Sequence, residues 1–195
     1  MPRIDPRTVA TVTDEIAIEP PKDASYHVGD SLLLVRIDRE LVKWGYVVVP
    51  VGIARVTSVQ ERQVLATLLT QYARVKEGRL ALPLEPFKDP GQVRPAPVEA
   101  GLEANIIGKR DEHEIVNASE QLFLDKGRAD GVVPGDMFEV YQPASNIVGE
   151  GSEHVRVTMM IIHAREHTAT GLVVVLNHPG VTPGMPARLI RKMPS

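Results

Sequence analysis

Short stretches in which apolar and polar residues alternate recur along the chain and predict β-strands. Residues 15–19, Glu-Ile-Ala-Ile-Glu, show the period of a strand with one buried face. Residues 47–49 and 173–175 are runs of valine, which suits a pleated, half-buried surface. Only residues 60–71 could instead form a helix, but the equivalent residues 166–176 are rich in Val and Thr, so we expect strands in both.

The strands predicted in the first half of the chain are residues 14–19, 31–37, 46–58, 64–72 and 79–84. Those predicted in the second half are residues 102–109, 120–125, 137–142, 154–164, 168–177 and 185–191. The predicted fold class is therefore all-β.

The two halves repeat one pattern when the chain is shifted by 106 residues without a gap. The shift places Gly29 and Asp30 on Gly135 and Asp136. It also places Ala54 on Met160, Val56 on Ile162, Ala66 on Leu172, Leu68 on Val174 and Gly78 on Gly184. We interpret the repeat as an internal duplication that yields two tandem β-barrel or sandwich modules.

A segment dense in proline and glycine, residues 87–101, separates the two halves and predicts an extended linker. The expected domains are residues 1–86 and residues 102–195. The strand at residues 102–109 has its counterpart at or before the N-terminus, so either the first barrel is incomplete or the chain begins inside a larger parent.

The repeated glycines and aspartates predict tight turns that lead into strands. Glycine tolerates a positive φ, and aspartate can accept a hydrogen bond from nearby backbone. The residues concerned are Gly29, Asp30, Gly78, Gly135, Asp136 and Gly184. We interpret them as structural turns rather than ligands, because the pair recurs at one turn of each module without clustered partner ligands.

The chain has 195 residues, a net charge of -3 and no cysteine. The charge argues against a nucleic-acid partner, and the absence of cysteine excludes disulfides and thiolate metal sites. No apolar run reaches the length of a membrane span. We therefore expect no nucleic-acid partner and no membrane span.

Candidate chemistry is sparse. His163 and His167 are four residues apart, but the surrounding sequence predicts strand, turn and strand rather than a zinc-binding helix. His178 could be a third ligand, although its surroundings predict an ordinary turn. No nucleophile elbow, Walker loop or dinucleotide motif occurs. We expect neither a cofactor nor a metal nor enzymatic activity.

An apolar segment around the single tryptophan is the candidate interaction surface. Trp44 and Tyr46 could anchor a partner, although Trp44 could equally plug one end of a barrel. Val47 and Val49 continue the segment towards Pro50, which fits an edge strand or a bulge. An apolar edge predicts assembly with protein partners, including other copies of the chain.

The second half resembles a known domain. Residues 122–127 form a predicted strand, and residues 131–141 read Gly-Val-Val-Pro-Gly-Asp-Met-Phe-Glu-Val-Tyr. This pattern resembles the C-terminal domain of the flagellar assembly protein T family. The first half, through residues 28–30, 51–56 and 75–80, looks like the region that follows LysM domains in envelope proteins, including those associated with type IV pilus secretins.

The resemblance implies a non-enzymatic scaffold of the bacterial cell envelope, in the periplasm or outside the cell, that supports a pilus, secretin, flagellum or peptidoglycan-associated machine. The chain carries no LysM sequence, so any association with peptidoglycan would need regions absent here. One alternative is a self-assembling subunit of an extracellular filament, sheath or viral particle. Another is a metal-assisted hydrolase that uses His163 and His167.

Overall fold

The computed structural model describes residues 9–22, 24–86, 91–99, 101–143 and 154–194. The chain divides into two compact units, Met1–Lys88 (unit 1) and Asp89–Ser195 (unit 2). The described residues contain strands, turns and one 3-10 turn at Arg128–Asp130, so the predicted all-β fold class is confirmed. In the described part of the chain, no helix has the length and apolarity needed to cross a bilayer.

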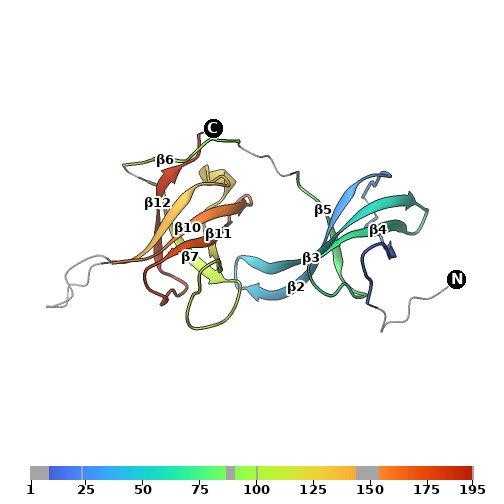
Figure 1. The fold of residues 1–195 in the computed structure, drawn as a ribbon, viewed down its shortest axis with the longest axis horizontal. Helices are drawn as coiled ribbons and strands as arrows, with labels where there is room; N and C mark the ends of the chain where they lie inside the picture. Colours follow the sequence, from blue (N-terminus) through green and yellow to red (C-terminus); the bar gives the residue numbers. More distant parts are fainter. Residues whose placement is uncertain (1–8, 23, 87–90, 100, 144–153, 195) are drawn as a thin grey trace. The chain divides into compact units, whose positions relative to one another are not determined.

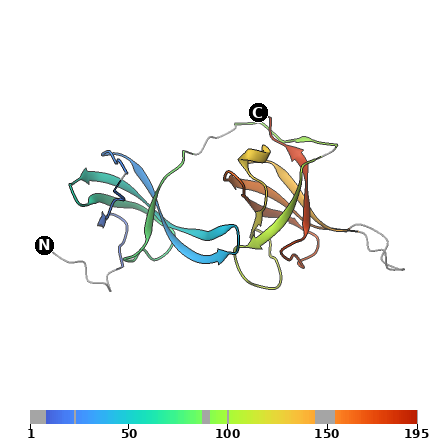
Figure 2. The same ribbon diagram turned by 180° about the vertical axis from the view of Figure 1, so that it is seen from behind.

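Unit 1 is a five-stranded antiparallel sheet with the order β1-β4-β3-β2-β5 (Figures 1 and 2). Its strands are β1 Glu15–Ile18, β2 Ser31–Leu41, β3 Gly45–Val59, β4 Val64–Gln71 and β5 Leu80–Pro83. Alternate residues of these strands face one side, where Leu34, Val51 and Leu68 form a buried cluster with Ala54, Ala66 and Val75. Because successive side chains of a strand point to opposite faces, the alternating apolar residues gather on one face of the sheet and form the core there.

Unit 2 is a closed six-stranded barrel with one further short strand paired to the end of β12. Its strands are β6 Ala96–Pro97, β7 Glu103–Lys109, β8 Gln121–Leu124, β9 Met137–Gln142, β10 His154–Ala164, β11 Ala169–Leu176 and β12 Pro186–Lys192. The barrel order is β7-β8-β11-β10-β9-β12, and β12 closes the ring by pairing with both β7 and β9. Closure removes the free edges that an open sheet would expose.

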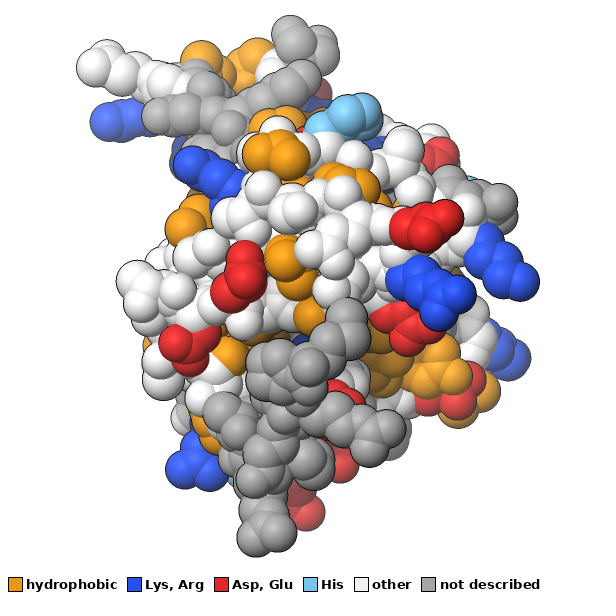
Figure 3. All heavy atoms as spheres, turned by 90° about the vertical axis from the view of Figure 1, so that its right-hand side faces the viewer, with side chains coloured by type: hydrophobic (Ala, Val, Ile, Leu, Met, Phe, Trp, Pro, Cys, Tyr) orange, Lys and Arg blue, Asp and Glu red, His pale blue; other side chains and the backbone are white. Residues whose placement is uncertain are grey.

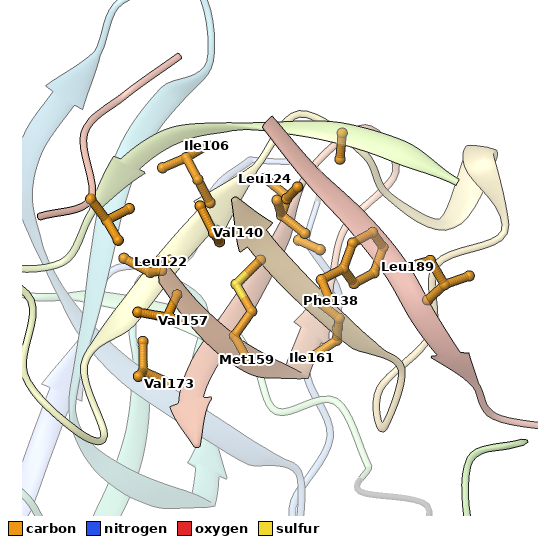
Figure 4. Packing of buried hydrophobic residues seen from close by; sticks show 14 of the residues in the cluster. Ile106, Leu122, Leu124, Phe138, Val140, Val157, Met159, Ile161, Val173 and Leu189 are labelled. Atoms are coloured by element: carbon orange, nitrogen blue, oxygen red, sulfur yellow. The ribbon is translucent and has the colours of Figure 1, made fainter. Parts of the chain in front are cut away.

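The interior of the barrel is packed with side chains rather than hollow. Phe138, Val140, Met159 and Ile161 project inward from neighbouring strands, as Figure 4 shows. Each of them is at most 1% exposed. A barrel of about eight strands has an interior just wide enough for side chains or for one small ligand, and in this smaller barrel the buried side chains form a packed core.

Every strand predicted from the sequence is present. β9 and β10 have the predicted bounds, whereas β2 runs to Leu41, past the predicted end at residue 37. The pairing of β6 with β12 places part of the segment predicted as a linker in the unit 2 sheet. β3 as a whole lies between β2 and β4, but its residues 47–51 pair only with β2, because the pairs between β3 and β4 begin at Gly52. The bulge interpretation is confirmed, because Pro50 flanks a register shift opposite Val35.

The two units share their strand order. The unit 1 order, β1-β4-β3-β2-β5, matches the order β8-β11-β10-β9-β12 in unit 2. Pairs between β2 and β5 recur 106 residues later; for example, Leu34↔Ala81 corresponds to Val140↔Ala187. Pairs between β3 and β4 recur 105 residues later, so that Ala54↔Leu68 corresponds to Met159↔Val173.

The bulges also coincide. The register of β3 and β4 shifts between Ile53 and Ala54, and that of β10 and β11 shifts at the equivalent place, between Thr158 and Met159. The backbone repeats too, since Thr13 and Ser119 are equivalent and have φ values of 79° and 67°. The amides of these two residues donate to the carbonyls of Leu68 and Val173 respectively. The units therefore share one topology, while their origin by duplication stays a prediction.

The structure changes the alignment of the two central strands. The ungapped shift put Ala54 on Met160 and Val56 on Ile162, but the pairing puts them on Met159 and Ile161. A slip of one residue moves a side chain to the other face of a sheet. Accordingly Met159 is buried, whereas Met160 is 37% exposed. The two units differ by one residue between Arg36 and Val49 and by one compensating residue between β4 and β5.

Candidate interaction site

The most prominent exposed feature of unit 1 is the end of the β2–β3 hairpin, beyond the residue pairs that have described counterparts in β9 and β10. Arg36↔Val49 corresponds to Gln142↔His154, the last described pair of β9 and β10. Beyond this pair β2 and β3 remain hydrogen-bonded to each other as far as Leu41↔Gly45. We call residues 37–48 the β2–β3 arm.

A tight turn ends the arm. The Trp44 amide donates to the Leu41 carbonyl over 2.8 Å, which closes a four-residue turn. Lys43 has a φ of 72° and Gly45 a φ of 100°. Positive φ is easy for glycine but costly for lysine, so the turn holds Lys43 in a strained conformation. The turn places Trp44 at the start of the return strand.

The arm carries a concentration of exposed apolar side chains. These are Ile37, Val42, Trp44, Tyr46 and Val48, each of which is 39% to 76% exposed. Ile37 lies opposite Val48 in the ladder, and Tyr46 lies two residues before Val48, so these three side chains share one face. Exposed aromatic and aliphatic side chains that are gathered on one face are typical of a protein-binding surface.

The four candidate interaction residues divide between two faces. Trp44 and Tyr46 are 43% and 60% exposed, whereas Val47 and Val49 are 5% and 6% exposed. The alternation along β3 accounts for the division. Asp38 of the arm forms ion pairs with Arg39 and with Arg36, which directly precedes the arm. The arm therefore offers apolar contacts on the face of Tyr46 with charged residues beside it.

The surface outside the arm is mixed. On the face drawn in Figure 3, acidic and basic side chains are interspersed, and hydrophobic side chains reach the surface between them. Tyr72, between β4 and β5, is 58% exposed and supplies an aromatic surface residue away from the arm.

The repeated Gly-Asp pairs occupy equivalent turns. Gly29 and Gly135 have φ values of 97° and 94°, which favour glycine. Asp30 accepts a hydrogen bond from the backbone N–H of His27, and Asp136 accepts the same bond from Val133. Gly78 and Gly184 also have positive φ, at 79° and 91°.

Asp136 makes further contacts that Asp30 does not. Its carboxylate is fully buried, pairs with Lys192 Nζ at 2.7 Å and accepts from the Met193 amide at 2.8 Å. Lys192 is the last residue of β12, and Met193 comes directly after it. The turn before β9 is thereby tied to the strand that closes the barrel.

The histidines lie in a hairpin and in a turn. His163 belongs to β10, opposite Thr170, and His167 lies in the turn between β10 and β11. His178 accepts a hydrogen bond at Nδ1 from the Gly180 amide over 3.2 Å. Among the described residues, no group of three or more His, Cys, Asp or Glu side chains could hold a metal ion.

Two exposed aspartates have lowered pKa values. The Thr11 amide, followed by the Thr11 hydroxyl, donates to Asp14 and lowers the pKa of that carboxyl below its ordinary 3.8. The Gly127 amide, followed by the Lys126 ammonium, does the same for Asp130. Both carboxylates accept from a backbone amide three residues earlier, so both stabilise turns rather than a reactive site.

Sequence reasoning missed Ile37, Val42 and Val48 as members of the arm. The three consecutive charged residues from Asp38 to Glu40 are typical of a loop, so the sequence did not predict that β2 continues through them. The signal that could have found them is the unbroken β-branched run of residues 47–49, because a strand needs a partner strand to pair with.

No family model matches the chain, and no curated protein or solved structure matches it. The resemblance to the C-terminal domain of flagellar assembly protein T and to regions that follow LysM domains therefore stays a prediction.

Proposed function

We propose that the protein is a non-enzymatic interaction module of a bacterial cell-envelope assembly, and that it binds a protein partner through the β2–β3 arm. The observation that carries this proposal is the gathering of Trp44, Tyr46 and neighbouring apolar side chains on an exposed hairpin. Tryptophan and tyrosine are the residues most enriched among those that dominate binding energy.

The shape of the arm supports binding rather than mere surface exposure. A two-stranded ribbon holds its own backbone hydrogen bonds, so its side chains are presented in a fixed register. Side chains that are already ordered lose less conformational entropy when they bind. Ile37, Tyr46 and Val48 together form a short apolar strip of the kind that becomes the dry centre of an interface.

The test is the size of the native assembly after gentle extraction. The wild-type chain is expected in a complex larger than the monomer, and the double variant Trp44→Ser, Tyr46→Ser is expected mainly free. Loss of two such anchors weakens binding by about 30-fold or more. Tyr72→Ser is the matched control, because Tyr72 is 58% exposed, close to the 60% of Tyr46, but lies outside the arm.

An arm variant that stays fully in the complex would contradict the proposal. Light scattering on the purified chain separates the assembly alternatives. A monomer at high concentration supports a different protein as the partner, whereas ordered polymers of the purified chain favour the filament or sheath alternative.

The envelope location rests on the resemblance of residues 122–141 and is tested separately. Fractionation of the producing cells should place the protein in the periplasm or with the envelope. Recovery of all the protein in the cytosolic fraction would remove this part of the proposal and would leave the arm untouched.

A further inference from the structure

Unit 1 contains counterparts of five of the six barrel strands of unit 2, and no described residue takes the place of the sixth, β7. In unit 2, β7 pairs with β8 on one side and with β12 on the other, and so closes the barrel. The counterparts of β8 and β12 are β1 and β5, which are the two edges of the unit 1 sheet. Open edges present unpaired backbone donors and acceptors.

The inward side chains along these edges are incompletely covered. Ile16, Ile18 and Ala81 pack against the core of unit 1 but are only partly buried. Their counterparts in unit 2, Leu122, Leu124 and Ala187, are each 0% exposed. The difference is what β7 covers in the closed barrel. We call the space between β1 and β5, bounded by Ile16, Ile18 and Ala81, the β1–β5 slot.

Backbone groups beside the slot correspond to groups that bond to β7 in unit 2. In unit 2, the Ile106 amide donates to the Met185 carbonyl over 2.9 Å, and the Ile106 carbonyl accepts from the Gly184 amide over 2.7 Å. The equivalent groups in unit 1 are the carbonyl of Arg79 and the amide of Gly78. Neither has a backbone hydrogen-bond partner among the residues that the structure describes.

We propose that the β1–β5 slot accepts an extended segment of a partner protein, which inserts antiparallel to both β1 and β5 and takes the place that β7 has in unit 2. This is strand addition to a sheet edge, in which backbone hydrogen bonds supply affinity and alternate side chains supply selectivity. It involves edges of the sheet that the β2–β3 arm does not use, so it stands independently of the proposed function.

The unit 2 barrel shows which inward side chains fit. Ala104 of β7 lies opposite Ala187, and Ile106 lies opposite Leu124. Ala187 is equivalent to Ala81, and Leu124 is equivalent to Ile18. The partner segment therefore carries a small residue facing Ala81 and, two residues later, a branched aliphatic residue facing Ile18.

Charge specifies the outward positions. Glu15 at the start of β1 and Glu19 directly after its end are exposed and alternate with the inward Ile16 and Ile18. In unit 2 the residue equivalent to Glu19 is Asp125, which accepts a hydrogen bond from Asn105 Nδ2 on β7 over 2.8 Å and whose amide donates to the Asn105 carbonyl over 3.1 Å. A lysine or arginine at the outward positions complements the two carboxylates, so the partner segment is basic on its outer face.

Two other occupants fit less well. The sequence of residues 1–8 contains Pro2 and Pro6, and proline cannot donate within a strand that is paired on both sides. The β7 strand of a second copy is already paired with its own β8 and β12. Both occupants remain outcomes of the test.

The first experiment uses the full chain and a synthetic peptide with the sequence of residues 102–110 as the probe. Backbone amide NMR should show saturable changes in β1 and β5 and slower hydrogen exchange at Gly78 and Glu19. A control peptide with Ile106→Asp should bind about tenfold or more weakly, because it would bury a carboxylate inside the sheet. Equal binding of both peptides, or changes outside residues 15–19 and 78–83, would overturn the proposal.

The state of the slot before peptide is added distinguishes the other occupants. If the amides of Gly78 and Glu19 are already protected in the monomeric chain, its own residues fill the slot and the proposal is wrong. If their protection rises with protein concentration together with dimer formation, a second copy fills it, and the proposal is equally wrong.

A second variant keeps the proposal testable if the free peptide binds too weakly to detect. Residues 102–115 are placed directly before Ala10, in place of residues 1–9, because Ala10 and Val116 are equivalent. The grafted strand should protect β1 and β5 and raise the urea midpoint of unit 1. The matched graft with the copied Ile106 replaced by aspartate should do neither. A graft that leaves exchange in β1 and β5 unchanged shows that the slot does not accept a strand.

Discussion

Replacement of Asp136 by alanine should destabilise unit 2 strongly, because one buried carboxylate serves three donors. It accepts from the amides of Val133 and Met193 at 3.0 and 2.8 Å and pairs with Lys192 at 2.7 Å. Each buried amide left without an acceptor costs about 1–3 kcal/mol. Lys192 is 35% exposed and can be hydrated again, so it adds little. The expected loss in free energy of unfolding is about 3–5 kcal/mol.

The chain contains its own control in Asp30, which occupies the equivalent turn of unit 1. Asp30 accepts from the His27 amide at 2.8 Å, and its side chain is 43% exposed, so water can replace it. Asp30→Ala should cost about 1 kcal/mol or less.

Urea unfolding followed by backbone amide NMR reads the two units separately. All methionines except Met1 lie in unit 2, so their methyl signals give a second probe of that unit. Amides at the end of β12 should exchange fastest in Asp136→Ala, because the Met193 contact holds that end. Losses for Asp136→Ala and Asp30→Ala that agree within about 0.5 kcal/mol would refute the assignment of barrel closure to this carboxylate.

Three further results are expected. Gly171→Ala should lower the free energy of unfolding by about 1–3 kcal/mol, because a new Cβ would lie 2.6 Å from Met159 Sδ. In a double-mutant cycle, Met159→Ala should lower it less in the Gly171→Ala background than in the wild type. Additive losses would contradict this packing. Lys43→Gly should raise the free energy of unfolding of unit 1 by about 0.5–1 kcal/mol by relieving the positive φ of 72°, as measured by urea unfolding, and a loss of stability would contradict the strain. The pKa of Asp14 in the folded protein lies below the unfolded value of 3.8, so its stabilisation of the turn is present above pH 3.8 and is lost as the pH falls through the folded pKa. The NMR chemical shift of the Thr11 amide should follow this titration in the wild type and not in Asp14→Asn.

The positions of the strands could be predicted from the sequence because alternation and β-branched runs report backbone conformation directly. Which side chains of β10 and β11 point inward could not be predicted. Met159 and Met160 are both apolar, as are Ile161 and Ile162, so either member of each pair satisfies an inward position. The structure buries Met159 and Ile161 and leaves Met160 and Ile162 37% and 39% exposed.

The candidate site was predictable only in part. Trp44 and Tyr46 stand out in a chain with few aromatics, and the structure exposes both. The length of the arm was not predictable, because the charges of Asp38, Arg39 and Glu40 resemble a loop until the ladder shows that they belong to β2. The β1–β5 slot needed the barrel of unit 2 for comparison, since an open edge is defined by which strands pair and not by local residue preference.

The matching registers and bulges of the two units have a consequence for folding. A strand from either unit meets the backbone hydrogen-bonding pattern of the other, so discrimination during folding rests on side-chain volume. Ala54 and Ala66 in unit 1 are replaced by Met159 and Gly171 in unit 2, and the large side chain then sits over a residue that has none. A nascent or refolding chain that exchanges these strands would form paired but poorly packed sheets, a characteristic misassembly of multidomain proteins.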